Sequence, residues 1–137
     1  MLRGIDPLLT PDLLHALAAM GHGDTLVIVD ANFPAANLAR RLIRLPGIDT
    51  PRALAAVLSL LPLDDFIPNP AAVMEVVGDP KTVPPPVAEM TALLPAPPLR
   101  LERHAFYAAA RDSFAVVATG ERRFYGNIIL TKGVIPP

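Results

Sequence analysis

The amino-acid sequence predicts an α/β protein, with a largely parallel sheet that is covered by helices. Segments typical of helices and of strands alternate along the chain, which is characteristic of sheets whose strands are joined by helical crossovers. The segments at 25–30 and 114–120 are apolar on successive residues, as strands buried on both faces usually are. The chain has 137 residues, no internal repeat and no long linker, so residues 1–137 are expected to form one domain.

The first helix is expected to begin after Thr10 and to end at Gly21. Threonine is a favoured N-cap, Pro11 fits the first helical position, and Asp12 interacts favourably with the positive end of a helix. One apolar face is formed by Leu13, Leu14, Leu17 and Met20. The buried strand TLVIVD then follows at 25–30.

The middle of the chain repeats this start signal. A turn at residues 33–34 leads into a short helix, and a longer helix is then expected with Thr50 as its cap and Pro51 in its first turn. Pro62 ends that helix, because proline cannot continue one. The segment AAVMEVV at 71–77 is expected to be the next strand.

The last part of the chain begins with a segment rich in proline. Prolines between residues 80 and 98 frame one short helix at 87–94, and the segment is interpreted as a rigid excursion on the surface. The remaining elements expected are a short strand at 99–102, a helix at 103–113 and buried strands at 114–120 and 127–133.

The composition excludes several classes of site and partner. Without cysteine the chain forms neither disulfides nor thiolate zinc sites, and a cytoplasmic location is expected. His15 and His22 are seven residues apart, but the helix is expected to end between them, so no metal site is expected. The net charge is −1 without a basic block, so nucleic acid is not expected as a partner. No apolar run reaches the roughly 20 residues of a membrane span. The hydrophobic content of 52% suggests burial between subunits of a homo-oligomer.

The segment MGHGDTLVIVDANFP holds the first candidate site residues. Asp30 ends a buried strand, and ligands of open α/β sheets gather outside the carboxyl ends of the strands. His22 lies between two glycines, and histidine is the side chain best suited to proton transfer near neutral pH. A structural interpretation stays open, in which His22 complements the helix dipole and Asp30 caps a turn.

Two further groups carry polar side chains suited to a ligand. Arg103 and Tyr107 are four residues apart and share a helix face, although an arginine there could simply be solvated. Tyr125 and Asn127 flank Gly126 and lie on the same side if the backbone is extended. Their hydroxyl and amide groups suit a polyhydroxylated ligand, and ordinary turn chemistry is the alternative.

Three segments occur in an order and spacing that resemble one known family. They are MGHGDTLVIVDANFPA at 20–35, RHAFYAAARDSFAVVATGE at 103–121 and YGNIILTKGV at 125–134. Together with the opening IDPLLTPDLL, they resemble the ribose pyranase and fucose mutarotase family, and more closely its L-fucose branch. The resemblance covers nearly the whole chain apart from residues 80–98.

The resemblance implies a ribose pyranase-like, three-layer α/β fold and an enzyme that interconverts anomers or ring forms of free monosaccharides. It implies rings that commonly stack as decamers, sites where neighbouring subunits meet, and no metal or organic cofactor. It also implies roles for five residues: His22 matches the catalytic histidine, and Asp30, Arg103, Tyr125 and Asn127 match sugar-contacting positions.

The chain departs from the family pattern at one position. The fucose branch often has histidine where this chain has Asn32, which leaves the exact sugar open. Asn32 can still hydrogen-bond a sugar hydroxyl. The neighbouring Phe33 is a candidate to pack on the C6 methyl group of a deoxy sugar.

Anomer exchange needs one proton removed from the anomeric hydroxyl and one placed on the ring oxygen. His22 is expected to be the principal acid/base, with Tyr125 as the second proton-transfer group. Asp30 either orients His22 or binds a hydroxyl, and Arg103 and Asn127 hold ring hydroxyls. The expected activity is α/β exchange of L-fucose. The alternatives are a D-ribose pyranase and a sugar-binding oligomer without turnover.

Overall fold

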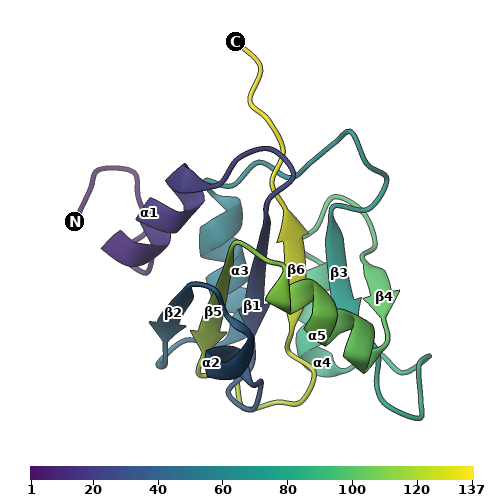
Figure 1. Ribbon diagram of the computed structural model, residues 1–137. Coiled ribbons are helices and arrows are strands. Elements are labelled where there is room, and N and C mark those ends of the chain that lie inside the picture. Colours follow the sequence, from purple (N-terminus) through teal and green to yellow (C-terminus); the bar gives the residue numbers. More distant parts are fainter.

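The computed structural model describes residues 1–137 and has a six-stranded sheet with helices on both faces (Figure 1). The strands are β1 (Thr25–Val29), β2 (Leu42–Leu45), β3 (Ala71–Met74), β4 (Leu99–Leu101), β5 (Ala115–Thr119) and β6 (Ile128–Thr131). The helices are α1 (Pro11–Ala19), α2 (Ala35–Leu38), α3 (Thr50–Leu58), α4 (Pro85–Thr91) and α5 (Arg103–Arg111). The predicted α/β class is confirmed.

The strand order is β2-β5-β1-β6-β3-β4. β1 and β2 both pair with β5 in parallel, and β3 pairs with β4 in parallel. β6 is antiparallel to both of its neighbours, β1 and β3, so the other strands all run in one direction. The prediction of a largely parallel sheet is therefore confirmed. Because β6 runs the opposite way, its first residues lie at the edge where β1 and β3 end.

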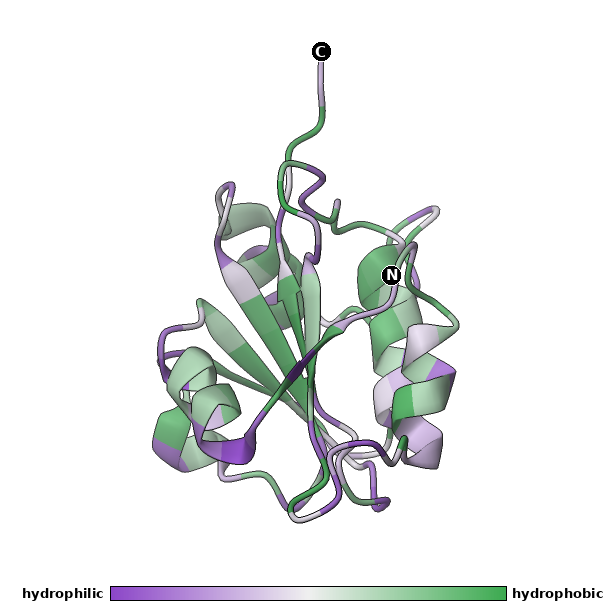
Figure 2. Ribbon diagram, turned by 90° about the vertical axis from the view of Figure 1, so that its right-hand side faces the viewer, coloured by the Kyte–Doolittle hydropathy of each residue, from purple (hydrophilic) through white to green (hydrophobic).

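The sheet has a hydrophobic core on each face, which makes three layers (Figure 2). Successive residues of β1 divide between the two cores: Leu26 and Ile28 face one, Val27 and Val29 the other. The larger core has 22 buried residues and is covered by α1, α3 and α4. The smaller core has 10 buried residues and is covered by α2 and α5.

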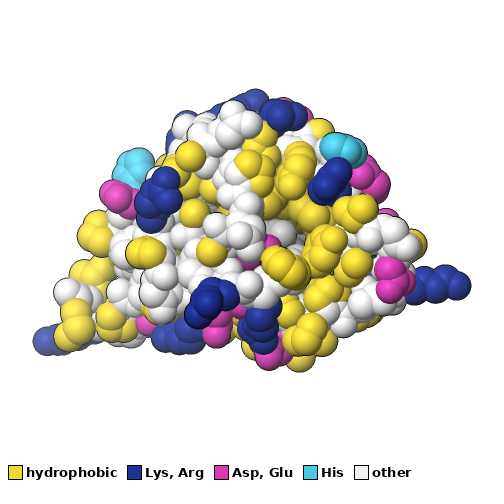
Figure 3. Space-filling model, turned by 90° about the horizontal axis from the view of Figure 1, so that it is seen from below, with side chains coloured by type: hydrophobic (Ala, Val, Ile, Leu, Met, Phe, Trp, Pro, Cys, Tyr) yellow, Lys and Arg dark blue, Asp and Glu magenta, His cyan; other side chains and the backbone are white.

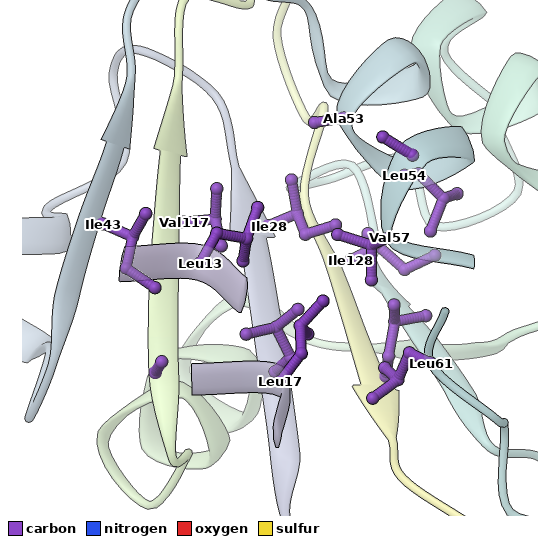
Figure 4. Close-up of a cluster of buried hydrophobic side chains, with 14 of the residues drawn as sticks. Leu13, Leu17, Ile28, Ile43, Ala53, Leu54, Val57, Leu61, Val117 and Ile128 are labelled. Carbon is purple, nitrogen blue, oxygen red and sulfur yellow. The ribbon is translucent and has the colours of Figure 1, made fainter. Parts of the chain in front are cut away.

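The larger core is a continuous apolar layer between helices and sheet. In Figure 4, Leu13 of α1 lies beside Ile28 of β1, and Val57 of α3 lies beside Ile128 of β6. All four side chains are fully buried. Burying one side chain of this size stabilises a fold by roughly 1.5–3 kcal/mol. The packing of this layer therefore contributes strongly to the stability of the sheet.

Helix α1 begins as the sequence predicts. The Thr10 hydroxyl accepts a hydrogen bond from the Leu13 amide at 3.4 Å, and the helix ends with Met20 as its C-cap. The ammonium group of Lys132 donates to the carbonyl oxygens of Leu17 at 2.8 Å and Met20 at 2.5 Å. Lys132 therefore satisfies carbonyl groups that a helix end leaves without partners.

Two local features differ from the predictions. Strand β2 was not expected, because only alternate residues of its four are well buried and Arg44 is exposed, which leaves little apolar signal. Helix α3 is capped by Asp49, which accepts from the Arg52 amide at 2.9 Å, and not by Thr50. Thr50 is the buried first residue of the helix, and its hydroxyl donates to Glu121 at 3.4 Å.

None of the helices has the length and apolar character that crossing a bilayer would require.

Candidate functional site

A cavity of about 320 Å³ opens at the edge of the sheet where β1 ends and β6 begins. Four of the five predicted site residues line it: Asp30, Arg103, Tyr125 and Asn127. Figure 3 looks onto this end of the molecule and shows a hollow with hydrophobic side chains around it. The cavity combines these polar groups with aromatic side chains of the smaller core.

Asp30 and Asn127 form a buried polar pair between the end of β1 and the start of β6. The Asp30 amide donates to Asn127 Oδ1 at 2.9 Å, and Asn127 Nδ2 donates to Asp30 Oδ2 at 3.2 Å. The Asn32 amide donates to Asp30 Oδ1 at 2.9 Å. Burial raises the pKa of the Asp30 carboxyl, while the hydrogen bonds from Asn32 and Asn127 oppose that shift. Asp30 is only 5% exposed, so a hydroxyl that reaches it meets a carboxylate with little competing water.

Tyr125 has an unusual backbone conformation for a residue with a side chain. Its φ of 63° lies in the left-handed region, which costs an L-residue roughly 1–2 kcal/mol. Its hydroxyl accepts a hydrogen bond from the Val77 amide at 3.1 Å, and its carbonyl accepts one from the Asn127 amide at 2.8 Å. The backbone is therefore not extended here, so the condition under which alternation would place the two side chains together is not met. Tyr125 and Asn127 still line the same cavity, because a tight left-handed turn joins them.

Helix α5 presents Arg103 and Tyr107 to the cavity, as their spacing predicts. The helix is capped by Glu102, whose Oε2 accepts from the amides of His104 at 2.9 Å and Ala105 at 3.2 Å. Arg103 makes no ion pair with a carboxylate. Its guanidinium therefore keeps a fork of donors available for the oxygens of a ligand.

Two apolar residues of the cavity were not identified from the sequence, Met74 and Val77. The predicted strand ran to residue 77, so the strand-end rule that selected Asp30 would have indicated Val77, whereas β3 ends at Met74, at the same edge as Asp30. Phe124 adjoins Tyr125 and is 72% exposed, which is unusual for a phenylalanine. With Phe33, these side chains offer an apolar surface beside the polar pair.

His22 lies at the opposite edge of the sheet, before β1 begins. Its Nε2 is 3.2 Å from Asp64 Oδ1, and its ring packs edge-on against Phe66 with centroids 5.2 Å apart. The Asp64 side chain is 6% exposed, whereas that of His22 is 43% exposed. Asp64 also accepts from the Phe66 amide at 3.0 Å. The sequence did not identify Asp64, which lies two residues after Pro62; that proline was predicted to end the preceding helix, but α3 already ends at Leu58.

Within one chain, His22 and the cavity do not meet. The five residues of β1 lie between them and span about 16 Å. Asp30 therefore cannot orient the His22 of its own chain, and the orienting contact is made by Asp64 instead. Of the two roles left open for Asp30, hydroxyl binding fits its place in the cavity. No group of three or more His, Asp or Glu side chains is arranged to hold a metal ion.

Sequence relatives extend over the whole chain. The fucose mutarotase of Bos taurus is 46% identical over 147 residues, covering 100% of this chain and 96% of that protein. The fucose mutarotase of Homo sapiens is 46% identical over 145 residues, covering 98% and 94%. These alignments include both edges of the sheet and the residues of the cavity.

Solved structures agree with the fold. The fucose mutarotase from Streptococcus pneumoniae, solved in complex with L-fucose, matches with a TM-score of 0.92 and 37% identity, covering 98% of this chain and 100% of that one. RbsD from Bacillus subtilis, complexed with D-ribose, matches with a TM-score of 0.80 at 23% identity and supports the fold alone. The RbsD / FucU transport protein family matches residues 3–135. The chain therefore belongs to the RbsD / FucU family.

Proposed function

We propose that this protein is an L-fucose mutarotase, an isomerase that interconverts the α and β anomers of the free sugar. The observation that carries the proposal is the full-length identity of 46% to fucose mutarotases. It is supported by a similar structure, solved with L-fucose, at a TM-score of 0.92. The cavity of this chain has the polar and apolar groups that such a sugar requires.

The cavity can hold a sugar ring by its two kinds of surface. Asp30 and Asn127 accept and donate hydrogen bonds to ring hydroxyls, and Arg103 adds a fork of donors. Phe33 lies edge-on to Tyr107, with ring centroids 5.4 Å apart, and offers an apolar patch to a C6 methyl group. A 6-deoxy sugar such as L-fucose has both the hydroxyls and the methyl group that these surfaces recognise.

Ring opening requires two proton transfers and no change of oxidation state. A base removes the proton of the anomeric hydroxyl while an acid protonates the ring oxygen, the C1–C2 bond rotates, and closure reverses both transfers. Acid–base groups placed in this way contribute roughly 10²–10⁴-fold to the rate. Tyr125 is a proton-transfer group within the cavity, and His22 is the principal one, supplied by a neighbouring subunit.

A second copy of the chain completes the site. His22 is accessible at the edge opposite the cavity, so the histidine edge of one subunit can face the cavity of the next. Head-to-tail contacts form a ring when the rotation between neighbouring subunits closes, and we extend the proposal to a ring-based decamer. The histidine edge has the exposed apolar residues that an interface uses: Phe66 at 71% and Ile67 at 39% exposure.

Asp64 then has a defined part in the reaction. When the Nε2–H group of His22 donates a hydrogen bond to Asp64, Nδ1 becomes the nitrogen that exchanges protons with the sugar. Asp64 also limits the orientations of the ring, together with Phe66.

We place the enzyme in the cytoplasm, in keeping with a sequence that has no cysteine.

Saturation-transfer proton NMR tests the proposal directly. Catalytic amounts of the protein are added to L-fucose, and magnetisation transfer between the α and β anomeric signals is compared with a protein-free sample. D-ribose is measured in parallel, because Asn32 leaves the sugar preference open. Faster transfer with L-fucose supports the proposal, and a preference for D-ribose assigns the protein to pyranase activity. Binding without faster transfer for either sugar contradicts the enzymatic role.

A further inference from the structure

The loop between β5 and β6 carries Phe124 and Tyr125 into the cavity, and it holds Tyr125 in a left-handed conformation. Such a conformation persists only where the surroundings enforce it. Tyr125 itself makes two hydrogen bonds: its hydroxyl accepts from the Val77 amide at 3.1 Å, and its carbonyl accepts from the Asn127 amide at 2.8 Å. Its ring packs against the smaller core, and the other residues of the loop add further polar contacts.

Arg123, two residues before Tyr125, makes more polar contacts than any other arginine in the chain. Its Nε and its amide both donate to Glu121 Oε1 at 2.9 Å, and Nη2 donates to Glu121 Oε2 at 2.8 Å. On its other side, Nη1 and Nη2 donate to the two carboxylate oxygens of Glu89, each at 2.9 Å. None of these three residues lines the cavity.

Glu121 connects this cluster to both polar sides of the cavity. Its side chain is 3% exposed and also accepts the Thr50 hydroxyl, and its carbonyl accepts from the Ala31 amide at 2.8 Å, directly after Asp30. Gly126 packs against it so closely that an added Cβ would lie 2.8 Å from Glu121 Cγ. The backbone on either side of Tyr125 is therefore fixed by Glu121, and Arg123 fixes Glu121 in turn.

We infer that Arg123 is the positioning residue of the sugar-binding cavity. By joining Glu121 at the base of the loop to Glu89 on α4, it holds Tyr125 in its binding conformation before any ligand arrives. Helix α4 belongs to the proline-framed segment, which thereby acquires a role beyond that of a surface excursion. The effect on sugar binding rests on the proposed function, whereas the effect on the free protein does not.

The alternative is an ordinary surface ion pair with no influence on the cavity. The chain provides a matched control in Arg52, which bonds to Asp6 at 2.6 Å. Both arginine side chains are partly exposed, at 39% for Arg123 and 50% for Arg52. Arg52 makes no hydrogen bond to the loop and does not line the cavity. Arg52→Met therefore removes a partly exposed arginine–carboxylate pair that does not touch the site.

The tyrosines make the experiment selective. The chain has two tyrosines and no tryptophan, and both tyrosines line the cavity, so their ring NMR signals report on it alone. Tyr107→Phe identifies the signals of Tyr125. Those signals are recorded for the free oligomer of the wild type, Arg123→Met and Arg52→Met, and KM and kcat for L-fucose are then measured across pH.

The inference predicts displaced or broadened Tyr125 signals in Arg123→Met and unchanged signals in Arg52→Met. If the binding conformer falls to about a tenth of the population, KM rises roughly tenfold. The pH dependence of kcat stays that of the wild type, because Arg123 does not transfer a proton. If Arg123→Met does not fold, Glu89→Gln replaces it, since that change weakens one side of the cluster and keeps Glu121.

Unchanged Tyr125 signals and an unchanged KM in a folded Arg123→Met oligomer would overturn the inference. So would equal changes in Arg123→Met and Arg52→Met, because they would reflect a general loss of stability. A wild-type protein without sugar exchange would refute the proposed function and not this inference. In that case, the inference about Arg123 is tested by the Tyr125 signals of the free protein alone.

Discussion

The two edges of the sheet hold different parts of the proposed site, and they are built differently. At the cavity edge, Asp30 and Asn127 are almost fully buried and bonded to each other. At the histidine edge, the His22 side chain is 43% exposed and bonds to one carboxylate, that of Asp64. In the proposed site, the groups that recognise the sugar are fixed within one chain, whereas the proposed proton-transfer group, His22, is accessible to a neighbouring chain.

The histidine edge is nevertheless ordered by its backbone. The Gly21 amide donates to Asp24 Oδ2 at 2.7 Å, and the Gly23 amide donates to the Lys132 carbonyl at 2.9 Å. These bonds fix the loop and leave the imidazole accessible. The contrast predicts that substitutions at the histidine edge change the reaction more than the fold, and that substitutions at the cavity edge change both.

His22→Ala is expected to have the largest effect on activity. Loss of the principal acid/base should slow L-fucose exchange by roughly 10²–10⁴-fold, measured by saturation transfer. The melting temperature should change little, because the side chain is half exposed. His15→Ala, an exposed residue of α1, is the control. Wild-type exchange in a folded His22→Ala variant would remove His22 from the mechanism.

The acid stability of the cavity edge depends on Glu121. Hydrogen bonds from Arg123 lower the pKa of Glu121 from 4.5 to about 2, so its contribution is present above pH 4.5 and is lost as the pH falls toward 2. That contribution is up to about 3 kcal/mol of unfolding free energy. Urea unfolding between pH 5 and pH 2 should show a shallower pH slope for Glu121→Gln than for the wild type. Equal slopes would contradict this assignment.

Asp30→Asn tests sugar recognition at the cavity edge. A hydrogen bond to a charged group is typically worth about 1.5–3 kcal/mol, so exchange should slow by roughly 10- to 100-fold. Burial raises the pKa of Asp30, and the wild type should therefore lose activity on the acid side at a pH above the ordinary value of 3.8. In Asp30→Asn that acid limb should be absent. A pH–rate profile identical to that of the wild type would exclude the carboxylate from the reaction.

Glycine substitutions compare the packing of the two edges. At Gly126 an added Cβ would lie 2.8 Å from Glu121 Cγ and 2.9 Å from Thr50 Oγ1, whereas at Gly21 the nearest atom is 3.7 Å away. Gly126→Ala should lower the unfolding free energy by about 1–3 kcal/mol, as overpacking usually does. Gly21→Ala should leave it nearly unchanged. Equal losses of unfolding free energy in the two variants, measured by urea unfolding, would show that both edges accommodate an added methyl group equally well.

Local sequence signals predicted those parts of the fold that depend on neighbouring residues. Thr10 and Pro11 set the start of α1, and the run TLVIVD gave β1 with Asp30 at its end. Local sequence signals gave the wrong prediction where a contact with a residue distant in sequence determines the structure. Thr50 looked like a helix cap, but it is buried against Glu121, 71 residues away, and Asp49 caps the helix instead.

The candidate site shows the same division. Arg103 and Tyr107 were placed together correctly, because helix periodicity is a local property. The Asp64 partner of His22 was missed, since 42 residues separate the two in sequence and only the fold brings them together. The left-handed backbone of Tyr125 was missed as well, because non-glycine residues rarely adopt it without support from elsewhere in the structure.

Each site is proposed to be shared between two subunits, and mixing two impaired variants tests that sharing most directly. His22→Ala and Asp30→Asn oligomers are unfolded together in equal amounts, refolded, and assayed for L-fucose exchange. In a head-to-tail ring, roughly a quarter of the sites then combine an intact His22 edge with an intact cavity, so about a quarter of wild-type activity should return. Activity no greater than the average of the two separate variants would contradict a site shared between subunits.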